Sequence, residues 1–174
     1  EHFPRGRSFP AHPPPTLPDG LPHAGVRAFS IDDAATTEID DAFSVTPGGG
    51  GRIRVGIHIA APALGFNPGD ALDAIARDRL STVYMPGDKI TMLPADVVEA
   101  FTLAEGRSVP CVSLYLEVEP ADMAVASCES RVERIDIAAN LRHNDLDGLI
   151  TEQTLEAGGG AYPFAHELAL LWRL

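Results

Sequence analysis

Apolar and polar residues alternate over several short segments of the chain, and this period of two predicts β-strands. A first strand is expected over residues 26–31, and residues 42–45 and 52–60 flank a proline and four consecutive glycines, which predicts a hairpin with a loose turn. In residues 112–118 the valines and leucines alternate with Ser, Tyr and Glu, which predicts a half-buried strand, and residues 129–137 are expected to pair with it.

Apolar residues at steps of three and four predict short helices between and after these strands. Residues 71–80 form one such segment, with Asp70 as the expected N-cap, and Pro94 stands where a helix of one or two turns is expected to begin. Asn144 is expected to cap a further short helix, and Pro163 to open the last one. Strands and helices in this order predict a mixed α+β fold with an antiparallel-rich sheet and short helices.

The domain organisation follows from the distribution of proline. Residues 1–28 contain seven prolines and no sustained period, which is typical of an extended segment that covers a neighbouring surface or links domains. We therefore expect a lead-in or linker over 1–25 and one domain over 26–174. A chain of 174 residues is long enough to bury a core of its own.

Composition limits the classes of protein to which the chain can belong. Apolar residues make up 45% of it, yet no apolar run approaches the roughly 18–20 residues of a membrane helix, and no secretory leader is seen, so we expect a cytoplasmic protein without a membrane partner. Cys111 and Cys128 are too few for a disulfide scaffold and lack the paired spacing of a zinc site. We expect both to be buried, reduced thiols.

The net charge of −12 argues against strong binding of nucleic acid by this chain. Proteins that hold phosphates need a basic surface, and 13 Lys and Arg against 25 Asp and Glu do not supply one. If the chain acts on a nucleic acid, most of the binding must come from other parts of the protein.

The acidic residues are concentrated in one segment. Residues 32–41 hold five acids and no base: Asp32, Asp33, Glu38, Asp40 and Asp41. Two such charges about 4 Å apart repel by roughly 4 kcal/mol at an effective dielectric near 20. If the segment folds as a tight loop between two strands, its oxygen ligands favour a hard cation, Mg²⁺ or Mn²⁺, which is the usual equipment for phosphoryl chemistry.

Two other interpretations of this segment stay open from the residues alone. Acidic runs are common on solvated surface loops, where they have no ligand. A calcium site is also possible, although the segment lacks the residue order of an EF-hand loop.

Several ordered motifs resemble the catalytic (RNB) domain of the ribonuclease II and ribonuclease R family. Phe-Ser-Ile-Asp followed by an acid six residues later and then Asp-Asp-Ala-Phe resembles the family's acidic signature, and the likeness covers residues 26–150. The matching segments are residues 29–32, 38–43, 55–60, 68–73, 84–87, 90–94 and 141–145.

This resemblance implies a processive hydrolase that degrades single-stranded RNA from the 3′ end to nucleoside 5′-monophosphates with Mg²⁺, or with Mn²⁺ as a substitute. By position, Asp32, Glu38, Asp40 and Asp41 fall on the four acidic residues of the family's active site. We expect Asp32, Asp40 and Asp41 to bind metal, and Asp41 to be the least replaceable. Tyr84 falls on the tyrosine that packs against the 3′-terminal nucleotide, whereas its residue type alone favours a core position.

The chain also departs from the family pattern. Glu38 replaces the usual Asp, Ala61 replaces a frequent Asp, and the family's later Ser-Pro-Ile-Arg-like segment does not occur in the sequence. We therefore expect the second half of the catalytic domain and flanking OB-fold RNA-binding domains in the full-length protein, and little activity from this chain alone. A catalytically inactive RNB-like RNA-binding or scaffold domain is the main alternative, and a calcium-dependent structural module is a weaker one.

Overall fold

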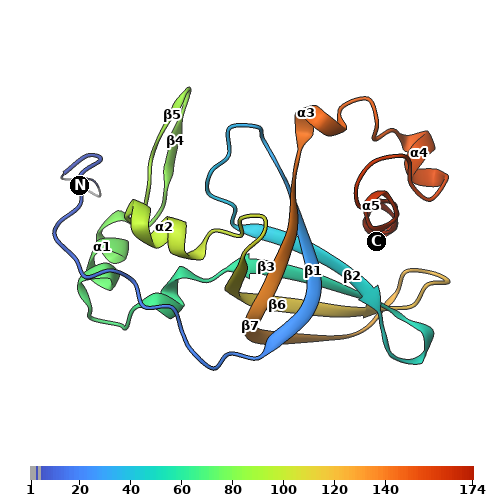
Figure 1. Cartoon of the computed structure of the whole chain (residues 1–174), viewed down its shortest axis with the longest axis horizontal. Coiled ribbons are helices and arrows are strands. Elements are labelled where there is room, and N and C mark those ends of the chain that lie inside the picture. Colours follow the sequence, from blue (N-terminus) through green and yellow to red (C-terminus); the bar gives the residue numbers. More distant parts are fainter. Residues whose placement is uncertain (1–2, 4) are drawn as a thin grey trace.

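Five strands close into a barrel in the computed structural model, which describes residue 3 and residues 5–174. Each strand pairs antiparallel with its neighbour except β1 and β7, which are parallel and complete the ring (Figure 1). The barrel strands, in their order around the ring, are β1 (His23–Asp32), β2 (Asp41–Pro47), β3 (Ile53–Ala60), β6 (Ser108–Val118) and β7 (Val125–Arg142). The predicted α+β class with a mainly antiparallel sheet is confirmed, and its closure into a barrel was not foreseen.

Short helices and one hairpin lie outside the barrel. The helices α1 and α2 and the hairpin β4–β5 are on one side in Figure 1, and α3, α4 and α5 are on the other. Their bounds are η1 (Gly49–Gly51), η2 (Pro62–Gly65), α1 (Ala71–Arg79), β4 (Val83–Met85), β5 (Asp88–Ile90), α2 (Ala95–Phe101), α3 (His143–Leu146), α4 (Glu152–Glu156) and α5 (Ala165–Arg173). In the part of the chain that is described, no helix is both long and apolar enough to cross a membrane.

The predicted helices exist, and Asn144 is the one predicted cap whose position was wrong. Asp70 is the N-cap residue of α1, yet its side chain accepts a hydrogen bond from the backbone N–H of Asn67, at 2.8 Å, and does not cap the helix. Asn144 lies inside the first turn of α3, whose N-cap position is Arg142. The expected helix starts at Pro94 and Pro163 are confirmed to within two residues. Proline suits such positions because its ring fixes the backbone just before a helix begins.

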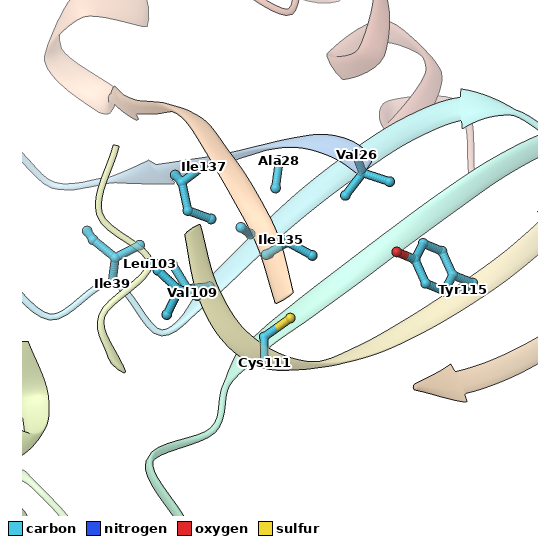
Figure 2. Close-up of a cluster of buried hydrophobic side chains, with 10 residues drawn as sticks. Val26, Ala28, Ile39, Leu103, Val109, Cys111, Tyr115, Ile135 and Ile137 are labelled. Atoms are coloured by element: carbon cyan, nitrogen blue, oxygen red, sulfur yellow. The ribbon is translucent and has the colours of Figure 1, made fainter. Parts of the chain in front are cut away.

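Apolar side chains from all around the ring fill one part of the barrel interior (Figure 2). Val109 and Ile135 are fully buried there, and Cys111 lies beside them, where burial raises the pKa of its thiol to about 11. The expectation of a buried, reduced thiol is therefore met at Cys111. The expected burial is wrong for Cys128, whose free thiol is exposed on β7.

Two groups of hydrogen-bonded polar side chains are also buried inside the barrel. The two ring nitrogens of His58 lie 2.8 Å from the hydroxyl of Ser44 and 2.8 Å from that of Ser113, and the hydroxyl of Tyr115 donates to Glu133 at 2.6 Å. All five side chains are buried. Each polar group has a partner, which offsets the cost of removing it from water.

This polar interior reverses the expected orientation of β6. Ser113 and Tyr115 point inward, whereas Val112 is 40% exposed on the outer face. Val112, Leu114 and Leu116 therefore do not form the buried face of the barrel, because its interior is partly polar.

The proline-rich lead-in packs on the outside of α1. Arg79 is 5% exposed and its guanidinium donates to the backbone carbonyls of Gly6 (2.9 Å), Ser8 (2.6 Å) and Thr91 (2.8 Å). The guanidinium also lies over the ring of Phe9, 3.9 Å from its centroid. The lead-in therefore covers a neighbouring surface, which was one of its two expected roles.

Candidate functional site

Ile39 fixes the acidic loop between β1 and β2 at one end of the barrel. Its side chain is 3% exposed within the barrel core, its N–H donates to the hydroxyl of Thr102 at 2.8 Å, and its carbonyl accepts from the N–H of Leu103 at 2.9 Å. Because Glu38 and Asp40 flank this anchored residue, they are held at the mouth of the barrel. Residue spacing alone did not reveal this role of Ile39.

A buried hydroxyl and a half-buried amide orient the carboxylate of Asp32. The hydroxyl of Ser30 donates to Asp32 Oδ2 at 2.6 Å, and the amide of Asn140 on β7 donates to that hydroxyl at 2.9 Å. The amide of Asn140 also donates to the carbonyl of Leu103 at 2.9 Å. A series of hydrogen bonds thus fixes the carboxylate of Asp32 and connects β1, β7 and the segment before β6.

Basic residues from distant parts of the chain stabilise the acidic loop. Arg142, at the end of β7, donates to the backbone carbonyls of Asp33 (2.9 Å) and Thr36 (3.3 Å). Lys89, on β5, forms an ion pair with Glu38, its Nζ 2.7 Å from Oε2. The absence of a base inside the acidic segment is therefore compensated by two side chains that sequence reasoning did not select.

The acidic side chains act on one another electrostatically. The pKa of Asp40 is raised above its usual value, first by loss of hydration and then by the charges of Glu38 and Asp41, with a smaller effect from Asp32. The ammonium of Lys89 opposes the shift only in part. A cation near Asp40 would therefore relieve like-charge repulsion at this end of the barrel.

The acidic side chains that the structure describes nevertheless do not form a complete metal-binding site. Among residues 3 and 5–174, no three Asp, Glu, His or Cys side chains are arranged to hold a metal ion. The expected convergence of Asp32, Asp40 and Asp41 on one point is thus not found among these residues. Asp32 accepts a hydrogen bond from Ser30, and Glu38 is paired with Lys89. The oxygen-only donor set still suits Mg²⁺, which is commonly bound by one or two carboxylates together with water and substrate phosphate.

A groove of about 620 Å³ separates the acidic loop from the β4–β5 hairpin, and Figure 1 shows the hairpin standing beside the loop. Tyr84 is 69% exposed on the hairpin side of this groove, so it does not occupy the core position that its residue type alone would favour. Of the predicted site residues, the groove brings Tyr84 and Glu38 together. Its lining residues are Asp33, Ala35, Thr36, Glu38, Tyr84, Met85, Gly87, Asp88 and Lys89.

A second hollow of about 540 Å³ lies away from these charges. It is lined by apolar side chains from the barrel strands and from the segment 150–174, such as Ile57 and Trp172. No ionisable side chain lines this hollow, whereas four charged side chains line the groove. We therefore place the candidate site in the groove.

Comparisons with known proteins identify the family and the fold. Residues 24–169 match the family described as the RNB domain. Exoribonuclease 2 of Vibrio vulnificus is 37% identical over 90 residues, which are 51% of this chain and 14% of that protein. The chain spans less than a quarter of the length of the curated relatives it matches.

Solved structures share the fold at lower identity. Yeast Ssd1, described as a pseudonuclease, superposes with a TM-score of 0.72 at 20% identity, covering 84% of this chain and 19% of that one. Mycoplasma genitalium RNase R in complex with ribose-methylated single-stranded RNA gives 0.70 at 14% identity, covering 88% and 23%. These likenesses establish the fold alone, and the family match over most of the sequence establishes the relationship: the chain belongs to the RNB domain family of ribonuclease II and ribonuclease R.

Proposed function

We propose that this chain is part of a cytoplasmic 3′-to-5′ exoribonuclease that hydrolyses single-stranded RNA to nucleoside 5′-monophosphates. Membership of the family supports the reaction class. The observation that carries the proposal is the groove, in which an anchored acidic loop faces the exposed ring of Tyr84. A base stacked on that ring would contribute about 1–3 kcal/mol whatever its identity, as a processive enzyme requires.

The acidic residues divide into different tasks. Asp32, Asp40 and Asp41 are the proposed ligands of Mg²⁺, which would offset charge on the scissile phosphate and lower the pKa of the attacking water. Ser30 donates to one oxygen of Asp32, and the other oxygen would bind the metal. Glu38 is set apart by its ion pair with Lys89, and we assign it no metal.

The RNA strand would be held mainly by other parts of the full-length protein. The net charge of −12 gives this chain little attraction for phosphates. We propose that OB-fold RNA-binding domains and the second half of the catalytic domain supply the missing basic groups, and that residues 1–174 alone do not degrade RNA processively.

Digestion of 5′-labelled single-stranded RNA by the full-length protein tests the proposal. Wild type should give a ladder that shortens from the 3′ end, and Asp41→Asn should not. Asp78→Asn, the same substitution at an exposed residue of α1, is the matched control and should behave as wild type. Equal digestion by Asp41→Asn and wild type would refute the site assignment.

One observation favours a second candidate function, a catalytically inactive RNB-like domain that binds RNA or acts as a scaffold. The described acids contain no group of three in metal-binding geometry. Calorimetry with Mn²⁺ separates the two functions. An active site should bind Mn²⁺ more tightly in wild type than in Asp41→Asn, whereas an inactive domain should show no difference.

A further inference from the structure

Lys89 is the only lysine among the 13 basic residues of the sequence, and it lines the groove. It pairs directly opposite Tyr84 in the β4–β5 hairpin. Residues directly opposite one another on antiparallel strands project to the same face, with Cβ atoms about 5 Å apart. The hairpin therefore presents an aromatic ring and an ammonium side by side to the same space.

The ion pair with Glu38 leaves this ammonium accessible. The Glu38 side chain is 12% exposed and that of Lys89 is 32% exposed, so the carboxylate is the deeper member of the pair. An ammonium has three N–H donors, and within the described residues only Glu38 accepts from it. The remaining donors can bind a second anion without breaking the ion pair.

The other charges around the groove make Lys89 the expected contact for a phosphate. The charged side chains lining the groove are Asp33, Glu38, Asp88 and Lys89, and Asp88 forms an ion pair with Arg7, which is not among the lining residues. Lys89 is thus the one basic side chain among the described residues that form the walls. An RNA phosphate entering this acidic space would meet net repulsion everywhere else.

We propose that Lys89 binds a phosphate of the 3′-terminal nucleotide whose base stacks on Tyr84, and that Glu38 holds the ammonium in place for that contact. This inference rests on the proposed function, because it assumes that the groove receives the 3′ end of RNA. It explains the longer acid at position 38: its reach is used for Lys89, not for a metal ion.

Binding of single-stranded RNA to the full-length protein, measured without divalent metal as a function of salt, tests the contact. Lys89→Gln should raise Kd about tenfold at low salt and reduce the slope of log K against log salt by about 0.7, the value for one lost phosphate contact on a single strand. Lys89→Arg should restore most of both. Arg52→Gln, which breaks an ion pair with Glu119 whose two members do not line the groove, is the matched control and should change the slope little.

A double variant separates a lost contact from an exposed carboxylate. Lys89→Gln leaves Glu38 unpaired, and that negative charge alone would repel RNA. Lys89→Gln combined with Glu38→Gln removes the repulsion, so a Kd and salt slope that stay altered support the direct contact. A return of both to wild-type values would overturn the proposal.

Chemical coupling gives a readout that does not depend on affinity. RNA oxidised by periodate carries a 3′-terminal dialdehyde, to which a lysine amine adds with loss of water, and cyanoborohydride then reduces the imine. Peptide mapping should locate the label on Lys89, and labelling only elsewhere would contradict the proposal. If wild type neither binds nor degrades RNA, the proposed function itself fails. If wild type is active and Lys89→Gln is unchanged, only this inference fails.

Discussion

Acidification should destabilise the barrel through His58, the buried imidazole at its centre. The ring is fully buried between Ser44 and Ser113, and loss of hydration lowers its pKa from 6.5 to about 4, although the charge of Glu133 acts in the opposite direction. The unfolded chain takes up a proton near pH 6.5, whereas the folded chain does so only near pH 4. Between these values the unfolded state binds more protons, so stability falls as the pH falls.

The size of the effect follows from the shift. Each pH unit in this window costs about 1.4 kcal/mol, so lowering the pH from 7 to 5 should remove about 2 kcal/mol of the free energy of unfolding through His58 alone. With a urea m-value of about 2 kcal/mol per M, the unfolding midpoint should move down by about 1 M.

Urea unfolding of wild type and His58→Gln between pH 7 and pH 5 measures this contribution. Glutamine keeps one donor and one acceptor for the two serines but does not titrate. The variant should be less stable than wild type at pH 7 and should lose less stability on acidification. Parallel pH dependences for the two proteins would refute the reasoning, because other groups, such as Asp40, titrate in both.

Three further substitutions test separate parts of the structure. Ser30→Ala should lower the turnover of RNA by the full-length protein roughly tenfold, because Asp32 loses the hydroxyl that orients it. Ser30→Thr keeps a hydroxyl and should recover the turnover. Equal loss of turnover in both variants would exclude an orienting role for this hydroxyl. Arg79→Ala should lower the free energy of unfolding by about 2–3 kcal/mol and speed proteolysis within the lead-in, since three carbonyls lose a charged donor; unchanged cleavage would contradict it. Tyr84→Ala should weaken RNA binding by about 1–3 kcal/mol and Tyr84→Phe should not, whereas a loss in Tyr84→Phe would point to the hydroxyl.

The strands of the barrel could be predicted from the sequence because each carries its own local signal. Alternation of apolar and polar residues and the glycine-rich turn are enough to place β2 and β3. The orientation of β6 could not be predicted, because Ser113 faces inward only where His58 pairs with it across the sheet. That pairing is a property of the register, which a single strand does not reveal.

The candidate site likewise contains residues that could be predicted from the sequence and residues that could not. The acids and Tyr84 were predicted because they belong to contiguous motifs. Lys89 was missed because its partner Glu38 lies 51 residues earlier in the chain, and no local pattern marks such a pair. Ile39 was missed because an isoleucine between acids has no chemistry of its own, and its anchoring depends on hydrogen bonds to residues beyond α2.

The length of β7 has a consequence for how the family can vary. Its eighteen residues pair with β6 along the first part and with β1 along the last, and the strand ends at Arg142, which binds the acidic loop. Insertion or deletion of one residue near Glu133 would reverse which side chains face inward beyond that point and would displace Arg142 from its carbonyl partners. Changes of length in this strand should therefore be rare among active relatives, while the loops on either side of it remain free to differ in length.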